Sequence, residues 1–149
     1  MATPIRTSAQ DTERENQVLA RLQEAWNCNI VRTGYLDAWD GFAVRNGRSV
    51  AVLELKNRNI SINDYPTILV SLHKWWRLVN LAREMHIAPL FVVNYKDALA
   101  WVDLREVDAS RHEVRGRTDR TNAPSDIEPC LLVPVEDLKI VSEPLRAAA

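Results

Sequence analysis

Apolar residues recur every three or four positions in two stretches of the chain, a spacing that places them on one side of a helix. The first stretch predicts a helix from about residue 9 to 27, where Thr12-Glu13-Arg14-Glu15 has the spacing of an N-terminal capping box. The second predicts a helix from about Pro66 to His86, since proline is tolerated in a first turn. The apolar positions are Val18, Leu19, Leu22, Ala25 and Trp26 in the first, and Ile68, Leu72, Trp75, Val79, Ala82 and Met85 in the second. One side of each helix is therefore expected to be buried.

Short apolar runs bounded by turn residues predict the strands. A strand is expected at residues 29–35, and the runs on both sides of Asn46-Gly47 predict a β-hairpin whose second strand spans Ser49 to Lys56. Two further strands are expected at residues 90–95 and 98–104. The predicted order is therefore α-β-β-β-α-β with additions, which indicates an α/β fold.

The chain after residue 104 lacks a clear period. Residues 105–129 are rich in Arg, Asp, Thr and Pro, and we expect them to form a long loop, which in a compact domain is usually functional or disordered. Residues 130–149 are expected to form a C-terminal extension with a strand at 131–135 and a short helix or strand at 136–141. With a core at about residues 9–104, the chain of 149 residues is expected to fold as a single domain.

Composition is that of an ordinary globular protein. Hydrophobic residues make up 46% and charged residues 26% of the chain, and no apolar stretch has the length of a membrane span or a signal-peptide core. We therefore expect no membrane partner. Cys28 and Cys130 make neither a metal-binding spacing nor a disulfide framework, so we expect a reducing, cytoplasmic setting. The net charge of −1 is not that of a passive nucleic-acid coat protein, although arginines gather in residues 111–120.

Two acids and a lysine at the predicted hairpin are the candidate catalytic residues. Asp40 precedes the hairpin, and Glu54-Leu55-Lys56 ends its second strand. The Glu54 and Lys56 side chains leave a strand by the same face. Two carboxylates and the backbone carbonyl of Leu55 are oxygen ligands of the kind that Mg²⁺ prefers, and Mg²⁺ on a phosphate supports hydrolysis by water. The alternative is a solvated strand end without a site.

The role of Lys56 depends on its charge. Two neighbouring carboxylates are expected to raise the pKa of its ammonium group, which disfavours the free amine. We therefore expect Lys56 to orient the attacking water and to stabilise charge, with general base as the second option.

The register of the hairpin decides which acid faces Glu54. A two-residue turn would pair Arg45 with Arg48 and direct Asp40 away from Glu54, which would bring Asp37 to the Glu54 face. A three-residue loop over Arg45 to Gly47, or a bulge at Gly41, places Asp40 on the Glu54 side. We take Asp40 as the first acid, with Asp37 as the alternative.

This arrangement of Asp40, Glu54 and Lys56, together with the order of elements, resembles the PD-(D/E)XK nuclease superfamily. The resemblance covers about residues 9–104 and looks closest to the small single-domain members, the Holliday-junction-resolvase-like and phage-type endonucleases. It implies a restriction-endonuclease-like core, in which helices flank a central mixed sheet, and a metal-dependent DNA endonuclease. It also implies that Glu15 of the first helix supports the metal centre, although a capping-box glutamate is an equal alternative.

The resemblance further implies that polar residues near the start of the second helix contact the scissile strand, and Ser71 and Lys74 stand there. In the arginine-rich loop, Arg115, Arg117 and Arg120 are candidates to grip DNA phosphates, since the guanidinium fork matches phosphate oxygens; a solvated loop is the alternative.

Expected partners and cofactors follow from this hypothesis. Mg²⁺ is the expected cofactor, with Mn²⁺ as a substitute, and the absence of a glycine-rich phosphate loop argues against an organic cofactor. DNA is the expected partner, and cleavage of both strands by so small a nuclease would favour a homodimer or higher homo-oligomer. The alternatives are an inactive DNA-binding or assembly subunit with the same fold, and an exonuclease of the same superfamily.

Overall fold

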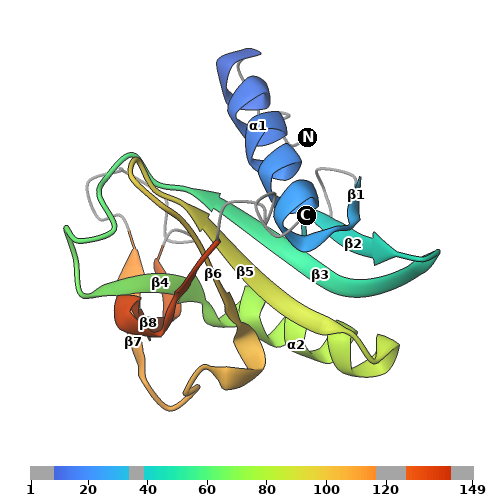
Figure 1. Ribbon diagram of the computed structural model, residues 1–149. Coiled ribbons are helices and arrows are strands. Elements are labelled where there is room, and N and C mark those ends of the chain that lie inside the picture. The colour runs from blue at the N-terminus through green and yellow to red at the C-terminus, as the bar shows by residue number, and fades with distance from the viewer. Residues whose placement is uncertain (1–8, 34–38, 117–126, 142–149) are drawn as a thin grey trace, which may run out of the picture.

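The computed structural model describes residues 9–33, 39–116 and 127–141, and is built on a mixed sheet with a helix on each face (Figure 1). The elements in chain order are α1 Ala9–Trp26, β1 Asn29–Arg32, β2 Gly41–Arg45, β3 Arg48–Asn57, β4 Thr67–Ser71, α2 Leu72–Met85, β5 Ala88–Asn94, β6 Leu99–Asp103, the 3-10 turn η1 Leu104–Glu106, β7 His112–Gly116, β8 Ile127–Pro134, the 3-10 turn η3 Val135–Asp137, and β9 Lys139–Ile140. The predicted α/β class with a central mixed sheet is confirmed. In the described part of the chain, no helix is both long and apolar enough to cross a membrane.

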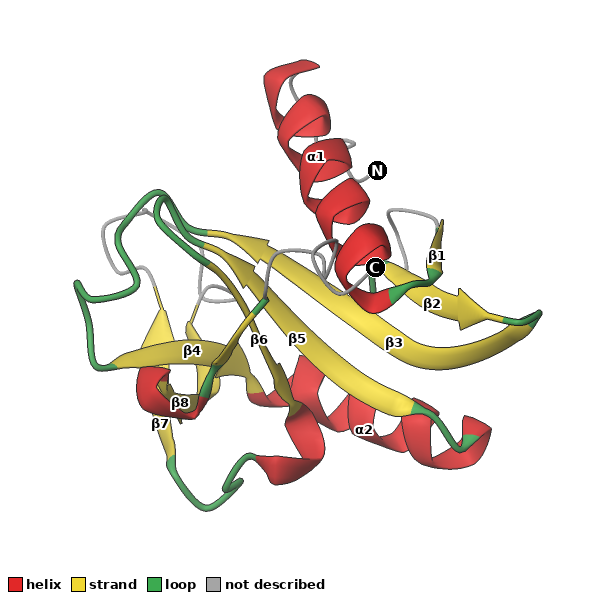
Figure 2. Cartoon of the chain, viewed as in Figure 1, coloured by secondary structure: helices red, strands yellow, loops and turns green. Residues whose placement is uncertain are grey.

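The central sheet has six strands in the order β1-β2-β3-β5-β6-β9. Strands β3 and β5 are parallel, whereas their other neighbours pair in antiparallel fashion. Parallel neighbours need a crossover connection, and α2 lies in it, against the face opposite α1 (Figure 2). The chain leaves β3 at Asn57, so the residues that end β3 lie where this crossover begins.

Alternation along β3 divides the core between the two helices. Val52 belongs to the cluster that includes Leu78 and Ala82 of α2, whereas Leu55 packs with Val18 and Leu22 of α1. Even-numbered residues at this end of β3 therefore face α2, and odd-numbered residues face α1. Glu54 and Lys56 share the α2 face, as the sequence predicted.

Strand β4 corrects the prediction that a helix begins near Pro66. Residues 67–71 bury alternate side chains, Ile68 and Val70, and pair with β8 in a second, three-stranded sheet ordered β4-β8-β7. Ile68 fits both a helical and a strand period, and the β-branched side chains here favour a strand once β8 supplies a partner. Helix α2 begins directly after β4, at Leu72 rather than near Pro66, with Ser71 as its N-cap.

The prediction of a long loop at residues 105–129 is also wrong in part. This range contains the last two residues of η1, all of β7 and the first residues of β8, while residues 117–126 lie outside the described structure. Among the described residues, strand β7 pairs only with β8, and Val114 within it is 69% exposed, so no apolar face marked it in the sequence. Its strand conformation comes from hydrogen bonds to β8, a long-range partner.

The turn between β2 and β3 has two residues rather than the expected three. Arg45 pairs with Arg48, and the turn residues Asn46 and Gly47 have positive φ angles of 54° and 75°, as a type I′ turn requires. Asparagine and glycine tolerate this left-handed conformation, so local chemistry selects the shorter turn.

A bulge then restores the register that the shorter turn would have lost. Ala43 pairs with Ala51 but Val44 pairs with Ser49, so Val50 is the extra residue; the bulge expected at Gly41 is thus found elsewhere. Gly41 pairs with Leu53, and the backbone N–H of Asp40 donates to the Leu53 carbonyl oxygen at 2.8 Å. Asp40 therefore lies level with Glu54 across the strand pair.

Candidate active site

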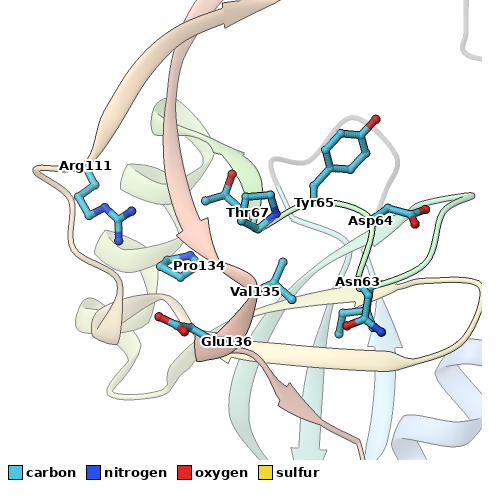
Figure 3. Close-up of a pocket in the computed structure, with 10 residues that line it drawn as sticks. Asn63, Asp64, Tyr65, Thr67, Arg111, Pro134, Val135 and Glu136 are labelled. Atoms are coloured by element: carbon cyan, nitrogen blue, oxygen red, sulfur yellow. The ribbon is translucent and has the colours of Figure 1, made fainter.

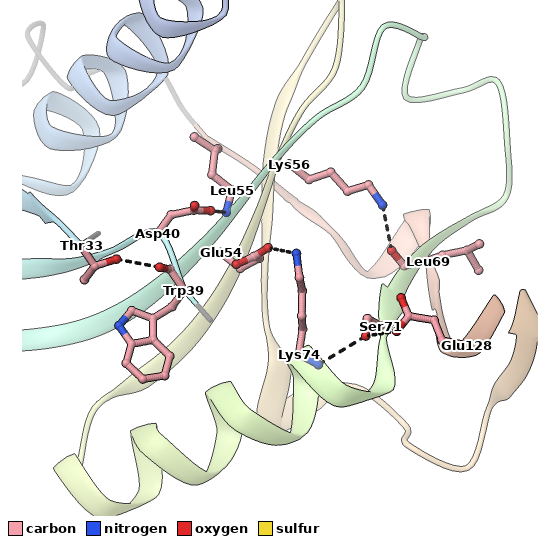
Figure 4. A network of polar contacts seen from close by, with 10 residues as sticks. All are labelled: Thr33, Trp39, Asp40, Glu54, Leu55, Lys56, Leu69, Ser71, Lys74 and Glu128. Carbon is pink, nitrogen blue, oxygen red and sulfur yellow. Dashed lines mark hydrogen bonds and ion pairs between the residues drawn. The ribbon is translucent and has the colours of Figure 1, made fainter. Parts of the chain in front are cut away.

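Asp40 immediately precedes β2 in the chain and lies beside β3. Its Oδ2 accepts a hydrogen bond of 2.6 Å from the backbone N–H of Leu55 (Figure 4). A strand N–H points along the sheet, so the carboxylate lies in the plane of the sheet, next to the strand that carries Glu54 and Lys56. The carbonyl of Leu55 leaves by the same edge as its N–H, toward Asp40.

Gly41, the residue after Asp40, allows β1 to lie close to the start of β2. A Cβ atom on Gly41 would lie 2.7 Å from the carbonyl oxygen of Val31 on β1, which is backbone and cannot move independently. The chain after Asp40 must therefore be glycine for β1 and β2 to pair as they do. Asp37, the alternative first acid, lies outside the described residues.

Glu54 is a buried acid, with 7% of its surface exposed. Burial raises the pKa of its carboxyl group; the hydrogen bond from Lys74 opposes this, and the charge of Asp40 raises the pKa further. A solvated strand end, the alternative expected from sequence, is thus wrong for this residue. A cation beside Glu54 would offset both its burial and the charge of Asp40.

Lys74 supplies one cation in the structure. Its Nζ donates to Oε1 of Glu54 at 2.7 Å from the first turn of α2. Burial alone would lower the pKa of Lys74, but the hydrogen bond and charge of Glu54, with the charges of Asp40 and Glu128, raise it overall. Lys74 was predicted as a DNA contact, and the structure places it on a candidate metal ligand.

Lys56 lies on the same face as Glu54 but has a different environment. Its Nζ is 3.4 Å from the carbonyl oxygen of Leu69 on β4. Burial lowers the pKa of the Lys56 ammonium, and the positive charges of Arg58 and Lys74 lower it further, against the opposing effect of Glu54. The expected rise is therefore wrong, because burial of Lys56 and the charges of Arg58 and Lys74 outweigh the effect of Glu54. A depressed pKa makes the neutral amine, and hence a general-base role, more accessible.

Ser71 and Glu128 extend this polar network. The hydroxyl of Ser71 accepts from the backbone N–H of Lys74 at 3.4 Å and donates to Oε2 of Glu128 at 3.1 Å. Glu128 was missed from the sequence because it lies in the range taken as a loop. No local signal could have found it, since only the pairing of β8 with β4 brings it to the start of α2.

Glu15 approaches Asp40 from the α1 side of the sheet. Its Oε2 lies 3.1 Å from Nη2 of Arg32 on β1, and Glu15 and Asp40 both line a small cavity between α1 and the sheet. Glu15 is thus held near Asp40 by a cation but does not share the face of Glu54. Of the three loop arginines, Arg115 lies on β7, and Arg117 and Arg120 lie outside the described residues.

These residues fit a magnesium site of low protein ligand count. Among the described residues, no group of three or more His, Cys, Asp and Glu forms a metal cluster. Magnesium needs only one or two protein carboxylates and completes its shell with water and phosphate oxygens. Asp40, Glu54 and the Leu55 carbonyl are such a set, and a cation there would offset the charge of Asp40 that raises the pKa of Glu54.

A separate groove of about 530 Å³ lies between residues 62–67 and Pro134–Glu136 (Figure 3). None of the candidate catalytic residues lines it. Its charged lining residues are Asp64, Glu136 and Arg111, so acids outnumber bases and the groove does not suit a phosphate backbone. The polar network at the end of β3 is therefore the candidate site.

Comparison with known proteins agrees with this fold. The chain is similar to a solved structure of Hjc, a Holliday junction resolvase from Archaeoglobus fulgidus, with a TM-score of 0.53 and 17% sequence identity over 67% of this chain and 77% of that one. At this identity the similarity concerns the fold. A comparison with curated proteins gives no match. The family model described as "Phage putative PDDEXK endonuclease" matches residues 1–141, so the chain belongs to this PDDEXK endonuclease family.

Proposed function

We infer that the protein is a Mg²⁺-dependent DNA endonuclease, with Mn²⁺ as a substitute, whose site consists of Asp40, Glu54 and Lys56. The observation that carries this proposal is a buried acid with a raised pKa beside a second acid and a lysine with a lowered pKa, in a chain of an endonuclease family. Perturbed ionisable groups of opposite kinds are typical of catalytic sites.

Each residue has a distinct role in this proposal. Asp40, Glu54 and the Leu55 carbonyl would hold Mg²⁺, which supplies charge neutralisation on the scissile phosphate and an acidified water when bound. Lys56 orients that water or takes its proton, since burial and its positive neighbours favour the neutral amine. Glu15 is not one of these ligands and supports the metal centre from the cavity that it lines together with Asp40.

DNA contacts are assigned to the surface around the start of α2. Lys74 is half exposed and stands next to the candidate metal ligands, where a phosphate oxygen would arrive. Ser71 presents a hydroxyl one turn earlier. We propose that Arg115, Arg117 and Arg120 bind further phosphates of the DNA. The double substitution Arg117→Ala and Arg120→Ala should therefore weaken DNA binding and lower the salt dependence of the DNA affinity.

Hydrolysis of different DNA forms tests the function. Supercoiled plasmid and a four-way junction are incubated with the protein in Mg²⁺, in Mn²⁺ and in EDTA, beside Asp40→Asn, Glu54→Gln and Lys56→Met variants. We expect metal-dependent cleavage by the wild type and none by the variants. Junction cleavage alone would indicate a resolvase, the activity named for the Archaeoglobus protein. Cleavage that persists in EDTA or in Lys56→Met would overturn the proposal.

The alternatives have weaker support. An inactive DNA-binding subunit gains nothing from two neighbouring acids beside phosphate, because the acids repel the ligand. An exonuclease of the same superfamily would release nucleotides from linear DNA and leave covalently closed plasmid intact, so the same assay separates it. A homodimer, which cleavage of both strands would favour, is tested by sedimentation with and without DNA. A cytoplasmic setting stays part of the proposal.

A further inference from the structure

Lys74 is the cation that neutralises the buried acid of the candidate active site. Its Nζ lies 2.7 Å from Oε1 of Glu54, whose side chain is only 10% exposed. Water therefore has little access to replace the ammonium, and a buried carboxylate that loses its cation is strongly unfavourable. The Lys74 ammonium thus holds a position that a divalent cation on Glu54 would also require.

A second acid lies within electrostatic reach of the same ammonium. Glu128 is bound through Ser71 to the first turn of α2, the turn that carries Lys74 (Figure 4). The negative charge of Glu128 acts on Lys74, as does that of Asp40. The Lys74 side chain is 52% exposed, so its flexible four-carbon stem has room to change conformation. One ammonium can therefore serve two acids on different elements, Glu54 on β3 and Glu128 on β8.

Building on the metal site of the proposed function, the geometry points to an exchange of partners: Lys74 neutralises Glu54 in the metal-free protein and turns to Glu128 when a divalent cation occupies Asp40 and Glu54. The ammonium is repelled by a dication on its own carboxylate partner, and Glu128 offers it an opposite charge nearby. Glu54 then has a cation in either state, the Lys74 ammonium without metal and the divalent cation with it. Lys74 also stays charged next to the bound metal, where the scissile phosphate is expected.

Metal affinity without DNA tests the exchange directly. Mn²⁺ binding is measured by calorimetry for the wild type, for Lys74→Met, which keeps an apolar stem, and for Lys74→Gln as a second variant. Both should bind Mn²⁺ about tenfold more tightly, because the competing ammonium is gone. Arg83→Met removes the same charge from the last turn of α2 and should leave the affinity unchanged. The melting temperature should also rise more on adding Mn²⁺ in Lys74→Met than in the wild type.

Glu128→Gln isolates the second half of the exchange. Glutamine keeps an oxygen that accepts from Ser71 but removes the charge that receives Lys74. In the wild-type background, Glu128→Gln should bind Mn²⁺ several-fold more weakly. In the Lys74→Met background, the same substitution should leave the Mn²⁺ affinity unchanged. A merely structural Glu128 would not show this dependence on Lys74. Equal Mn²⁺ affinity in the wild type and Lys74→Met would overturn the exchange while the metal site stands. If no variant binds Mn²⁺, both the exchange and the metal site fail.

Discussion

The carboxylate of Asp40 accepts a 2.6 Å hydrogen bond from the backbone N–H of Leu55, the residue between Glu54 and Lys56. This contact extends the pairing with β3 beyond the first residue of β2 and holds the carboxylate of Asp40 beside β3. Asp40 is therefore both a partner of the backbone and a candidate metal ligand. The two roles can be separated by substitution.

Asp40→Asn and Asp40→Ala should differ in stability but not in metal binding. Asparagine keeps an oxygen for the Leu55 N–H, whereas alanine leaves this donor without its partner, so Asp40→Ala should be about 1–2 kcal/mol less stable than Asp40→Asn. Both variants lack the carboxylate and should lose Mn²⁺ binding. Urea unfolding and calorimetry measure the two effects. Equal stability of the two variants would show that the hydrogen bond does not hold Asp40 in place.

Lys56→Met should abolish cleavage with little loss of DNA binding. The substitution keeps the aliphatic stem and removes the amine, so we expect cleavage to fall about a thousandfold, the range for loss of an acid–base group. Burial penalises the ammonium of Lys56, so the variant should be at least as stable as the wild type. Single-turnover cleavage, fluorescence anisotropy with labelled DNA, and thermal unfolding check the three points. Reduced stability would indicate a structural role instead.

The raised pKa of Glu54 predicts a pH dependence in the metal-free protein. A raised pKa means that folding favours the protonated acid, so this contribution to stability is present below the ordinary value of 4.5 and is lost as the pH rises through the value in the folded protein. Glu54→Gln removes it. In EDTA, the stability of the wild type relative to Glu54→Gln should therefore fall as the pH increases from about 4 toward 7. Urea midpoints at a series of pH values measure this, and a rising difference would contradict it.

Gly41→Ala should be far more harmful than Gly47→Ala. The new Cβ at position 41 would lie 2.7 Å from the Val31 carbonyl oxygen, whereas position 47 has open space and only an unfavourable φ of 75°. We expect losses of about 3 kcal/mol and about 1 kcal/mol respectively. Because Gly41 follows Asp40, Gly41→Ala should also weaken Mn²⁺ binding, and Gly47→Ala should not. Comparable losses in both variants would show that the β1–β2 contact adjusts freely.

Local chemistry was sufficient for much of the fold. Helix α1 and the strands β5 and β6 were found close to their observed limits, because each has a strong apolar period and clear ends. The shared face of Glu54 and Lys56 follows from the two-residue repeat of any strand. The Asn46-Gly47 pair selected its own turn, and the sequence already contained that signal, although we expected a longer loop.

The tertiary structure decided what depends on distant partners. Val50 forms the bulge that sets Asp40 level with Glu54, and the sequence around it allows other registers. Strand β4 and Glu128 reach the site only because β8 pairs with β4, a contact between segments some sixty residues apart that no local period encodes. The pKa of Lys56 is lowered rather than raised, since the fold buries this side chain and brings the charges of Arg58 and Lys74 near it. The sequence pointed to Asp40, Glu54 and Lys56 as candidates, whereas their pairing, their charge and the arrival of Glu128 follow from long-range contacts.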